Sequence, residues 1–247
     1  MGKLEGKTAI VTGSSRGIGA EVATLLAGEG AAVVVNYRQK APRANKVVSG
    51  IEEAGGRAAA VAGDLTTPEG VNDLVHCALD NFGGLDVLVL NASGGMEGGM
   101  EEDYALKLNR DAQVDTLNAA VEHMPAGSRV VFVTSHQSHF IHTVPTMAEY
   151  EPVAKSKRAG EDALRQMLPA LEEKGISLVV VSGDMIEGTV TSKLLDRSSP
   201  GAIEARRAEA GRLYSVEEFA AEVAKAVTAD VESGHTEYVG GADYFTK

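Results

Sequence analysis

The sequence is poor in several features that would point to other classes of protein. Cys77 is its only cysteine, so no intrachain disulfide can form. Basic residues are also scarce, because 23 Lys and Arg stand against 35 Asp and Glu and leave a net charge of −12. Nucleic acids and anionic membranes are bound through basic surfaces, so we expect neither as a partner.

Long apolar segments are missing as well. No run reaches the roughly 20 residues that a membrane-spanning helix needs. The N-terminal Met-Gly-Lys-Leu-Glu lacks the apolar segment of a signal peptide. There is also no Pro/Ser-rich linker and no charged low-complexity tract that would separate two domains. We therefore expect a cytoplasmic protein with a single domain over residues 1–247.

The chain does contain a regular alternation of apolar strands and helical segments. Most candidate strands are continuous apolar runs, which is typical of parallel strands covered by helices on both faces. These strands are expected over residues 7–12, 31–36, 57–62, 85–90, 129–134, 176–181 and 235–239. The helices are expected over residues 18–29, 40–54, 68–82, 101–124, 152–174 and 215–231. This order predicts an α/β fold, a single doubly wound Rossmann-type domain with a seven-stranded, mainly parallel sheet and helices on both faces.

Residues 12–19, Thr-Gly-Ser-Ser-Arg-Gly-Ile-Gly, join the first strand to the first helix. Gly13 can adopt backbone angles forbidden to other residues at the tight exit from the strand. Gly17 removes a side chain where a diphosphate must approach, and Gly19 lets the helix lie close to the sheet. The start of the helix offers free N–H groups and the positive end of its dipole. The loop therefore predicts a nucleotide-binding site, the alternative being a tight turn without a ligand.

Polar and glycine residues also follow the other strands at the points where these strands end. In an open α/β sheet, ligands bind outside the carboxyl ends of the strands. The residues at these ends are therefore expected to converge on one site. They are Asn36, Tyr37, Arg38, Asp64, the segment 91–94, Ser135, Gly183 and Asp184.

The end of the second strand helps to choose the nucleotide. NAD-specific sites usually place Asp or Glu there, where it binds the ribose 2′-hydroxyl. This chain has Asn36, Tyr37 and Arg38 instead, and Arg16 lies in the glycine loop. Two guanidinium groups without a carboxylate suit a 2′-phosphate, because Arg pairs well with phosphate oxygens. We therefore expect NADP(H), the alternative being that Arg38 and Lys40 are merely solvated.

At this point the sequence resembles the short-chain dehydrogenase/reductase family over nearly its whole length. The matching pieces are Thr12-Gly13-x3-Gly17-x-Gly19, Asp64, Asn91-Ala-Ser-Gly94, Asn109, Ser135, Ser156-Lys157 and Glu237-Tyr-Val-Gly-Gly241. The resemblance implies hydride transfer between a nicotinamide cofactor and a small carbonyl or alcohol substrate. We expect the cofactor to contact Gly13, Ser15, Arg16, Gly17, Ile18, Gly19, Asn36, Tyr37, Arg38, Asp64, Leu65, Asn91, Ala92, Ser93, Gly94, Lys157, Gly183, Ile186 and Thr189.

The resemblance also implies a set of catalytic side chains, one of which is missing. In this family a tyrosine and a serine act on the substrate oxygen, a lysine holds the ribose, and an asparagine supports a water-mediated proton path. Ser135, Lys157 and Asn109 match the serine, the lysine and the asparagine. The tyrosine belongs four residues before Lys157, where this chain has Val153. A valine cannot donate a proton, so the usual arrangement is broken.

Tyr150 is the nearest candidate to replace the missing tyrosine. It precedes Lys157 by seven residues, so the two share a helix face with a rise of about 10.5 Å between them instead of about 6 Å. Pro152 suits the first helical turn, so Tyr150 can lie in the preceding loop and swing inward. The alternatives are a structural tyrosine at this position and a proton supplied by His136, His139 or water.

These residues predict an NADPH-dependent ketoreductase with a rearranged proton donor. Val153 also motivates a different function, that of a catalytically inactive NADP(H)-binding regulator or scaffold. A lyase, dehydratase or isomerase on the same fold is a third possibility. His136, His139 and His142 lack the carboxylate or cysteine of a recognisable metal site, so no metal is expected.

Two further expectations concern the substrate side and the assembly. Residues 184–212 are expected to form a mobile substrate lid. Asp184 within it would bind a substrate hydroxyl or amine, or would cap the next turn. The resemblance also implies that the helices over 101–124 and 152–174 pair between subunits, which predicts a homodimer or homotetramer.

Overall fold

Parallel strands form the centre of the molecule. The computed structural model describes residues 2–96, 101 and 103–245. It contains a seven-stranded sheet in the order β3-β2-β1-β4-β5-β6-β7, in which every neighbouring pair is parallel. The strands are β1 (Thr8–Val11), β2 (Ala32–Tyr37), β3 (Arg57–Ala62), β4 (Val87–Leu90), β5 (Arg129–Ser135), β6 (Ser177–Gly183) and β7 (Thr236–Val239). The predicted doubly wound sheet is thus confirmed.

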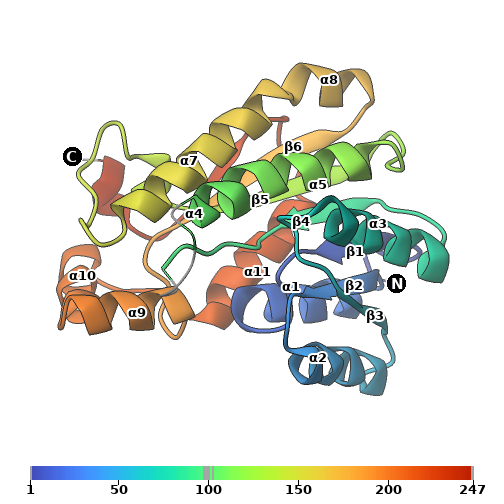
Figure 1. Ribbon diagram of the computed structural model, residues 1–247, viewed down its shortest axis with the longest axis horizontal. Coiled ribbons are helices and arrows are strands. Elements are labelled where there is room, and N and C mark those ends of the chain that lie inside the picture. The colour runs from blue at the N-terminus through green and yellow to red at the C-terminus, as the bar shows by residue number, and fades with distance from the viewer. Residues whose placement is uncertain (1, 97–100, 102, 246–247) are drawn as a thin grey trace.

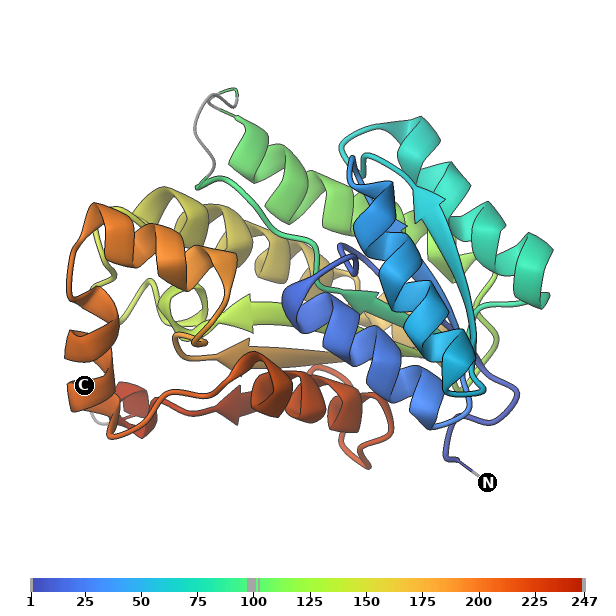
Figure 2. The same cartoon turned by 90° about the horizontal axis from the view of Figure 1, so that it is seen from below.

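Helices cover both faces of this sheet (Figure 1). One face carries α1 (Gly17–Gly28), α2 (Ala41–Glu53) and α11 (Val216–Val227). The other face carries α3 (Pro68–Phe82), α5 (Ala112–Val121), α7 (Glu151–Gln166) and α8 (Leu168–Glu173). Figure 2 shows the first group, in blue and red, in front of the strands. All six predicted helical segments therefore contain a helix.

The sheet divides the apolar core into two layers. Val33 and Val35 pack on the face that α1 and α2 cover, whereas Val34 between them packs on the opposite face. All three side chains are fully buried. β-branched side chains fit a pleated surface well, and strands covered on both faces have no polar side to present. This is why continuous apolar runs correctly indicated the strands.

The helix predicted over 101–124 is built differently from the expectation. It consists of α4 (Tyr104–Leu106), a π-helical turn (Lys107–Asp111) and α5, while residue 102 lies outside the described residues. The π-helical turn lies against α7, where a Cβ atom at Gly160 would be 2.0 Å from the carbonyl oxygen of Asn109. Only glycine permits so close an approach of the two backbones. The helix predicted over 152–174 likewise divides at Met167 into α7 and α8.

Several short helices were not anticipated. The sequence predicts a loop after Ser135 and a mobile lid over 184–212, but these segments contain α6 (His136–His139), α9 (Val190–Ser198) and α10 (Ala202–Ala210). A 3₁₀ turn (Ala242–Phe245) follows β7. Figure 2 shows α9 and α10, in orange, beyond the strand ends and beside the C-terminus. Such short, polar helices lack the long apolar periodicity by which helices are recognised in a sequence.

Candidate active site

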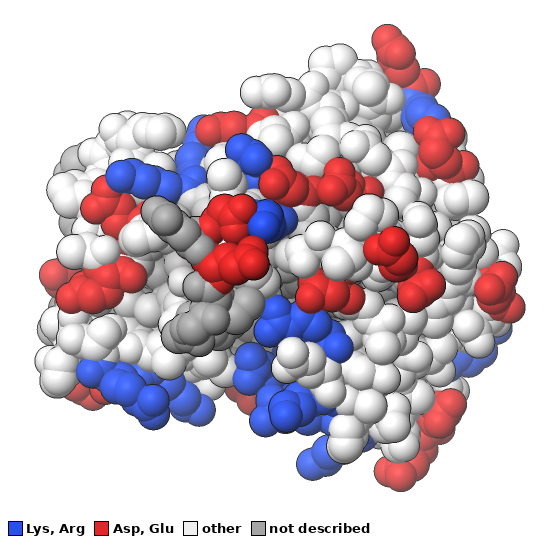
Figure 3. All heavy atoms as spheres, viewed as in Figure 1, with Lys and Arg blue, Asp and Glu red and all other residues white. Residues whose placement is uncertain are grey.

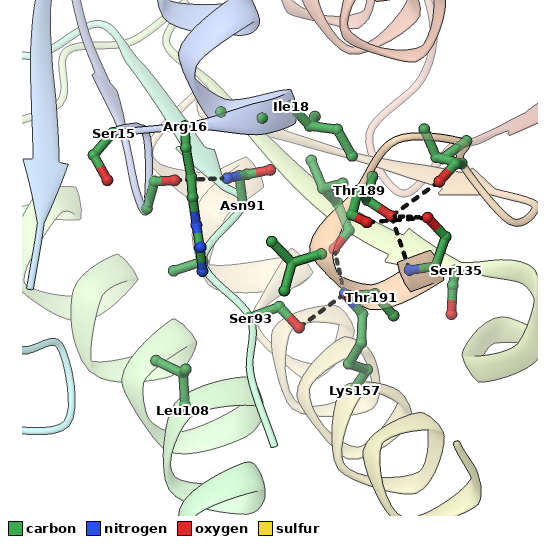
Figure 4. Close-up of a pocket in the computed structure, with 18 of the residues that line it drawn as sticks. Ser15, Arg16, Ile18, Asn91, Ser93, Leu108, Ser135, Lys157, Thr189 and Thr191 are labelled. Atoms are coloured by element: carbon green, nitrogen blue, oxygen red, sulfur yellow. Dashed lines mark hydrogen bonds between the residues drawn. The ribbon is translucent and has the colours of Figure 1, made fainter. Parts of the chain in front are cut away.

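A cavity of 630 Å³ lies at the carboxyl ends of the strands. The predicted site residues that line it are Gly13, Ser15, Arg16, Gly17, Ile18, Gly19, Asn36, Tyr37, Arg38, Asp64, Leu65, Asn91, Ala92, Ser93, Ser135, Tyr150, Lys157, Gly183, Ile186 and Thr189. Figure 4 shows the glycine-loop residues Ser15, Arg16 and Ile18 on one side of this space, with Ser135 and Lys157 on the others. Gly94 and Asn109 are the two predicted site residues that do not line it.

The glycine loop has the geometry that its sequence predicts. Gly13 and Gly17 have φ angles of +62° and +56°, in the left-handed region that favours glycine. A Cβ atom on Gly17 would meet nothing within 4 Å, because this position faces open space. A Cβ atom on Gly19, in contrast, would lie 2.6 Å from Nδ2 of Asn91, so this glycine allows α1 to approach the loop after β4. The N-terminus of α1 therefore opens onto the cavity.

The side chains of several predicted cofactor residues form hydrogen bonds with neighbouring strand ends. Asn36 accepts a hydrogen bond from the Gly13 N–H at 3.0 Å and donates one to the Gly63 carbonyl at 3.2 Å. Asn91 donates to the Thr12 carbonyl at 2.9 Å. The Asp64 carboxylate accepts from the N–H and the hydroxyl of a neighbouring threonine. These hydrogen bonds hold the strand ends together at the edge of the cavity.

Basic side chains gather at the end of β2. Arg16, Arg38, Lys40 and Arg43 all line the cavity, and Figure 3 shows blue side chains grouped near the start of α2. The Arg38 guanidinium donates to the hydroxyl of Tyr104 and lies 5.4 Å from the centre of its ring. Arg43 was not anticipated, although its place in the first turn of α2 directs it to the same edge as Arg38. This cluster forms a cationic end of the cavity.

Ser135 and Tyr150 come together at the opposite end of the cavity. The Tyr150 hydroxyl lies 3.3 Å from Oγ of Ser135, and Oγ of Ser138 lies 2.8 Å from the same Ser135 atom. Tyr150 is the N-cap residue of α7 and is only 5% exposed. Burial raises the pKa of its phenol, although hydrogen bonds with the two serines partly offset this. Ser138 was not anticipated, and its only signal in the sequence is the Ser-x-x-Ser spacing.

Lys157 lies on α7, and its side chain lines the cavity. Its Nζ donates to Oγ of Ser93 and to the carbonyl of Val133, both at 3.4 Å, and Figure 4 shows it reaching toward Ser93. Burial lowers the pKa of this ammonium to about 8, while the Glu161 carboxylate one turn later acts in the opposite direction. The side chain is therefore cationic at neutral pH but loses its proton under mildly alkaline conditions.

Val153 lies outside this polar arrangement. It is 4% exposed and packs in an apolar cluster with Tyr150, Ala154, Met185, Leu195 and Leu213. It is not among the residues that line the cavity. The position at which the resemblance places a tyrosine is thus occupied by a buried packing residue.

Asn109 connects the π-helical turn to the loop after β4 and to α7 through hydrogen bonds. Its amide nitrogen donates to the Gly94 carbonyl and to Oγ of Ser156, both at 2.9 Å. Its amide oxygen accepts from the Gly94 N–H at 3.2 Å. These contacts attach the loop after β4 to α7, and they place Gly94 and Asn109 behind the cavity wall.

The two histidines considered as proton donors also lie away from the cavity. Oγ of Ser182 lies 2.8 Å from Nδ1 of His136, and the Gly240 carbonyl lies 2.9 Å from its Nε2, so the ring is bound on both sides. Burial lowers its pKa. His139 contacts the carboxylate of Glu161 and the hydroxyl of Tyr238. Neither ring lines the cavity, so the structure does not bring them to Ser135.

Asp184 lines the cavity, and its carboxylate is bound by an arginine of the predicted lid. Both of its carboxylate oxygens accept hydrogen bonds from Nε of Arg206 on α10, at 2.8 and 3.1 Å. The same guanidinium binds Asp243 through two further hydrogen bonds at 2.6 and 2.8 Å. Arg206 thereby joins the end of β6 and the C-terminal 3₁₀ turn to the predicted lid. These contacts tie α10 to the end of β6, and the mobility of residues 184–212 stays a prediction.

Two other classes of site were searched for in the part of the chain that the structure describes. It holds no cluster of three His, Cys, Asp or Glu residues with the arrangement of a metal site. None of its helices is long and apolar enough to span a membrane.

Comparisons with known proteins place this chain in a family. Residues 7–198 match the family model described as short chain dehydrogenase. An uncharacterized oxidoreductase of Methylorubrum extorquens is 36% identical over 200 residues, which cover 78% of this chain and 79% of that protein. A hydroxynaphthalene reductase of Aspergillus fumigatus is 32% identical over 210 residues, or 80% of this chain and 73% of that protein.

Solved structures give the same result. A short chain dehydrogenase of Burkholderia cenocepacia in complex with NADP is 30% identical to this chain. The two superpose with a TM-score of 0.81 over 96% of this chain and 97% of the other. The fold, the glycine loop and these matches agree, and the chain therefore belongs to the short-chain dehydrogenase family.

Proposed function

We propose that this protein is an NADPH-dependent ketoreductase in which Tyr150 supplies the proton. The observation that carries the proposal is the contact between the Tyr150 hydroxyl and Oγ of Ser135, 3.3 Å apart in the wall of the cavity. One related protein is named a hydroxynaphthalene reductase, and another was solved with NADP, which supports this reaction class.

The residues at the cationic end fit a cofactor that carries a 2′-phosphate. Arg16, Lys40 and Arg43 line the cavity there, and among the described residues their charged groups form no ion pair or hydrogen bond. Guanidinium groups bind phosphate through charge-assisted hydrogen bonds. The free N–H groups at the start of α1 suit the diphosphate. NADPH bound here would supply the hydride that reduces the carbonyl carbon.

Ser135 and Tyr150 would act on the oxygen of the carbonyl group. A hydrogen bond from Ser135 polarises this oxygen, and the Tyr150 phenol gives it a proton as the alcohol forms. The phenol then recovers a proton from solvent. A phenol is protonated at neutral pH, and burial raises the pKa of Tyr150 further. This state suits carbonyl reduction and disfavours alcohol oxidation, which needs a phenolate as base.

The experiment that tests this function follows NADPH absorbance in the presence of ketones, diketones and quinones, with identification of the alcohol product. Oxidation of NADPH in step with formation of an alcohol supports the proposal. The buried Val153 favours a second candidate, an NADP(H)-binding protein without turnover. Tight NADPH binding with no oxidation across the whole panel would favour that candidate and contradict ours.

Replacing Arg38 by Gln is expected to weaken NADPH binding about tenfold and to change NADH binding less than twofold. The physical reason is the loss of a charge-assisted hydrogen bond to the 2′-phosphate, which NADH lacks. Cofactor fluorescence gives both dissociation constants. The matched control is Arg57→Gln, since Arg57 stacks on Phe82 outside the cavity. An equal loss of affinity for NADPH and NADH would show that Arg38 does not bind the 2′-phosphate.

The pKa of Lys157 predicts how cofactor binding depends on pH. A lysine whose pKa is lowered to about 8 is charged below that pH and becomes neutral as the pH rises through it. We therefore expect the dissociation constant of NADPH to be constant near pH 7 and to rise several-fold between pH 8 and about 9.5. Fluorescence titrations at several pH values measure it. In Lys157→Met this rise should vanish, and a rise that persists would assign it to another group.

A further inference from the structure

Gln137 is a cavity residue that the proposed reaction does not use. It lies on α6, two residues after Ser135, and its side chain is partly exposed in the cavity wall. An amide there offers hydrogen bonds to a bound molecule without contributing charge. The inference that follows rests on the proposed ketoreductase function and concerns the substrate of that site.

The orientation of the Gln137 amide is fixed by its neighbours. Its Oε1 accepts a hydrogen bond from the hydroxyl of Thr146 at 2.5 Å and one from the backbone N–H of Met147 at 2.9 Å. A backbone N–H is only a donor, so the amide atom that faces it must be the oxygen. The NH₂ group is therefore on the other side, and it donates no hydrogen bond within the described residues.

The surroundings of Gln137 indicate what kind of group this NH₂ binds. Tyr150, Met185 and Leu195 line the same cavity and belong to one apolar cluster. The cationic end lies at the glycine loop and β2, and the Lys157 ammonium is directed at Ser93 and Val133. An anionic group beside Gln137 would therefore lie apart from the cationic end, whereas a neutral oxygen needs only a hydrogen-bond donor.

We propose that Gln137 binds a second, neutral oxygen of the substrate. The reacting carbonyl group lies at Ser135 and Tyr150, the apolar body packs on Met185 and Leu195, and a second carbonyl or ester oxygen accepts from the Gln137 NH₂. The substrate class is thus a dicarbonyl compound or keto ester with an apolar body. A simple ketone fills the same space but leaves the amide donors unused.

The test compares two substrates in wild-type protein and in variants of Gln137. The substrates are 2,3-hexanedione and 2-hexanone, of which only the first carries a second oxygen. We expect Gln137→Met to lower kcat/KM for the diketone 3- to 10-fold more than for the monoketone, mainly through KM. Differences in the intrinsic reactivity of the two ketones cancel, because each variant is compared with wild type on the same compound.

Two further variants distinguish recognition from loss of structure. Gln137→Glu keeps an oxygen for Thr146 and Met147 but replaces the NH₂ group by a carboxylate oxygen, so it should disfavour the diketone at least as strongly. Gln166→Met makes the same change as Gln137→Met on the exposed side of α7 and should leave the ratio unaltered. Equal losses for both ketones in the Gln137 variants would overturn this inference alone. No reduction of any ketone by wild type would overturn the proposed function instead.

Discussion

Replacing Tyr150 by Phe is expected to lower kcat for ketone reduction by about 10²- to 10⁴-fold, the usual contribution of a positioned general acid. The substitution removes only the hydroxyl that lies 3.3 Å from Oγ of Ser135. The ring remains to pack in its apolar cluster, so the fold and the cationic end of the cavity should be preserved. Steady-state kinetics and NADPH fluorescence measure turnover and cofactor binding separately.

Tyr238→Phe provides the matched control for this experiment. Tyr238 lies on β7, and its hydroxyl contacts His139 outside the cavity. Loss of this hydroxyl should leave turnover close to that of wild type. If Tyr150→Phe also retains wild-type turnover, the phenol of Tyr150 is not the proton donor. If it loses turnover together with NADPH affinity, the role of Tyr150 is structural.

Replacing Arg206 by Met is expected to cost about 3 kcal/mol of unfolding free energy at neutral pH. Arg206 and Asp184 have side chains only 10% and 4% exposed, and removing one partner of a buried ion pair leaves the other charge uncompensated. For a chain of this size, such a loss corresponds to a thermal midpoint lower by about 10 °C. Differential scanning calorimetry or chemical denaturation measures it.

Two comparisons test the physical cause of this loss. Arg207→Met removes a neighbouring cation whose partners, Glu187 and Glu204, are more accessible, so it should cost much less stability than Arg206→Met. Adding Asp184→Asn to Arg206→Met should recover part of the stability, because the buried charge is then gone. A loss as small as that of Arg207→Met would mean that the Arg206 pair does not anchor α10.

The sequence was sufficient to predict the parts of the molecule that depend on local pattern. The strands follow from continuous apolar runs such as that around Val34, which is buried between two helical layers. The turn at Gly13 and the close approach at Gly19 follow from the need for residues without a side chain. Because parallel strands end at one edge, the position of the cavity followed from these strands.

What could not be predicted depends on contacts between distant residues. Asp184 meets Arg206 only because α10 folds back over the end of β6, and nothing near Asp184 in the sequence indicates this pairing. The hydrogen bonds of Asn109 also depend on residues far away in the sequence, Gly94 and Ser156. The lowered pKa of Lys157 is a consequence of burial, which a helical pattern alone does not reveal. Tyr150 could be named from spacing, but its contact with Ser135 required the path of the chain before α7.

The burial of Val153 limits which side chains this position can accept. Its Cγ2 atom lies only 3.2 Å from where a Cβ atom on Gly95 would be, and its neighbours fill the remaining space. A tyrosine introduced here would have to displace these neighbours, and overpacking of this kind costs about 1–3 kcal/mol. We therefore expect a tyrosine at position 153 to require compensating changes among the neighbours of Val153. A single substitution at this position would lose stability rather than simply add a hydroxyl group to the cavity.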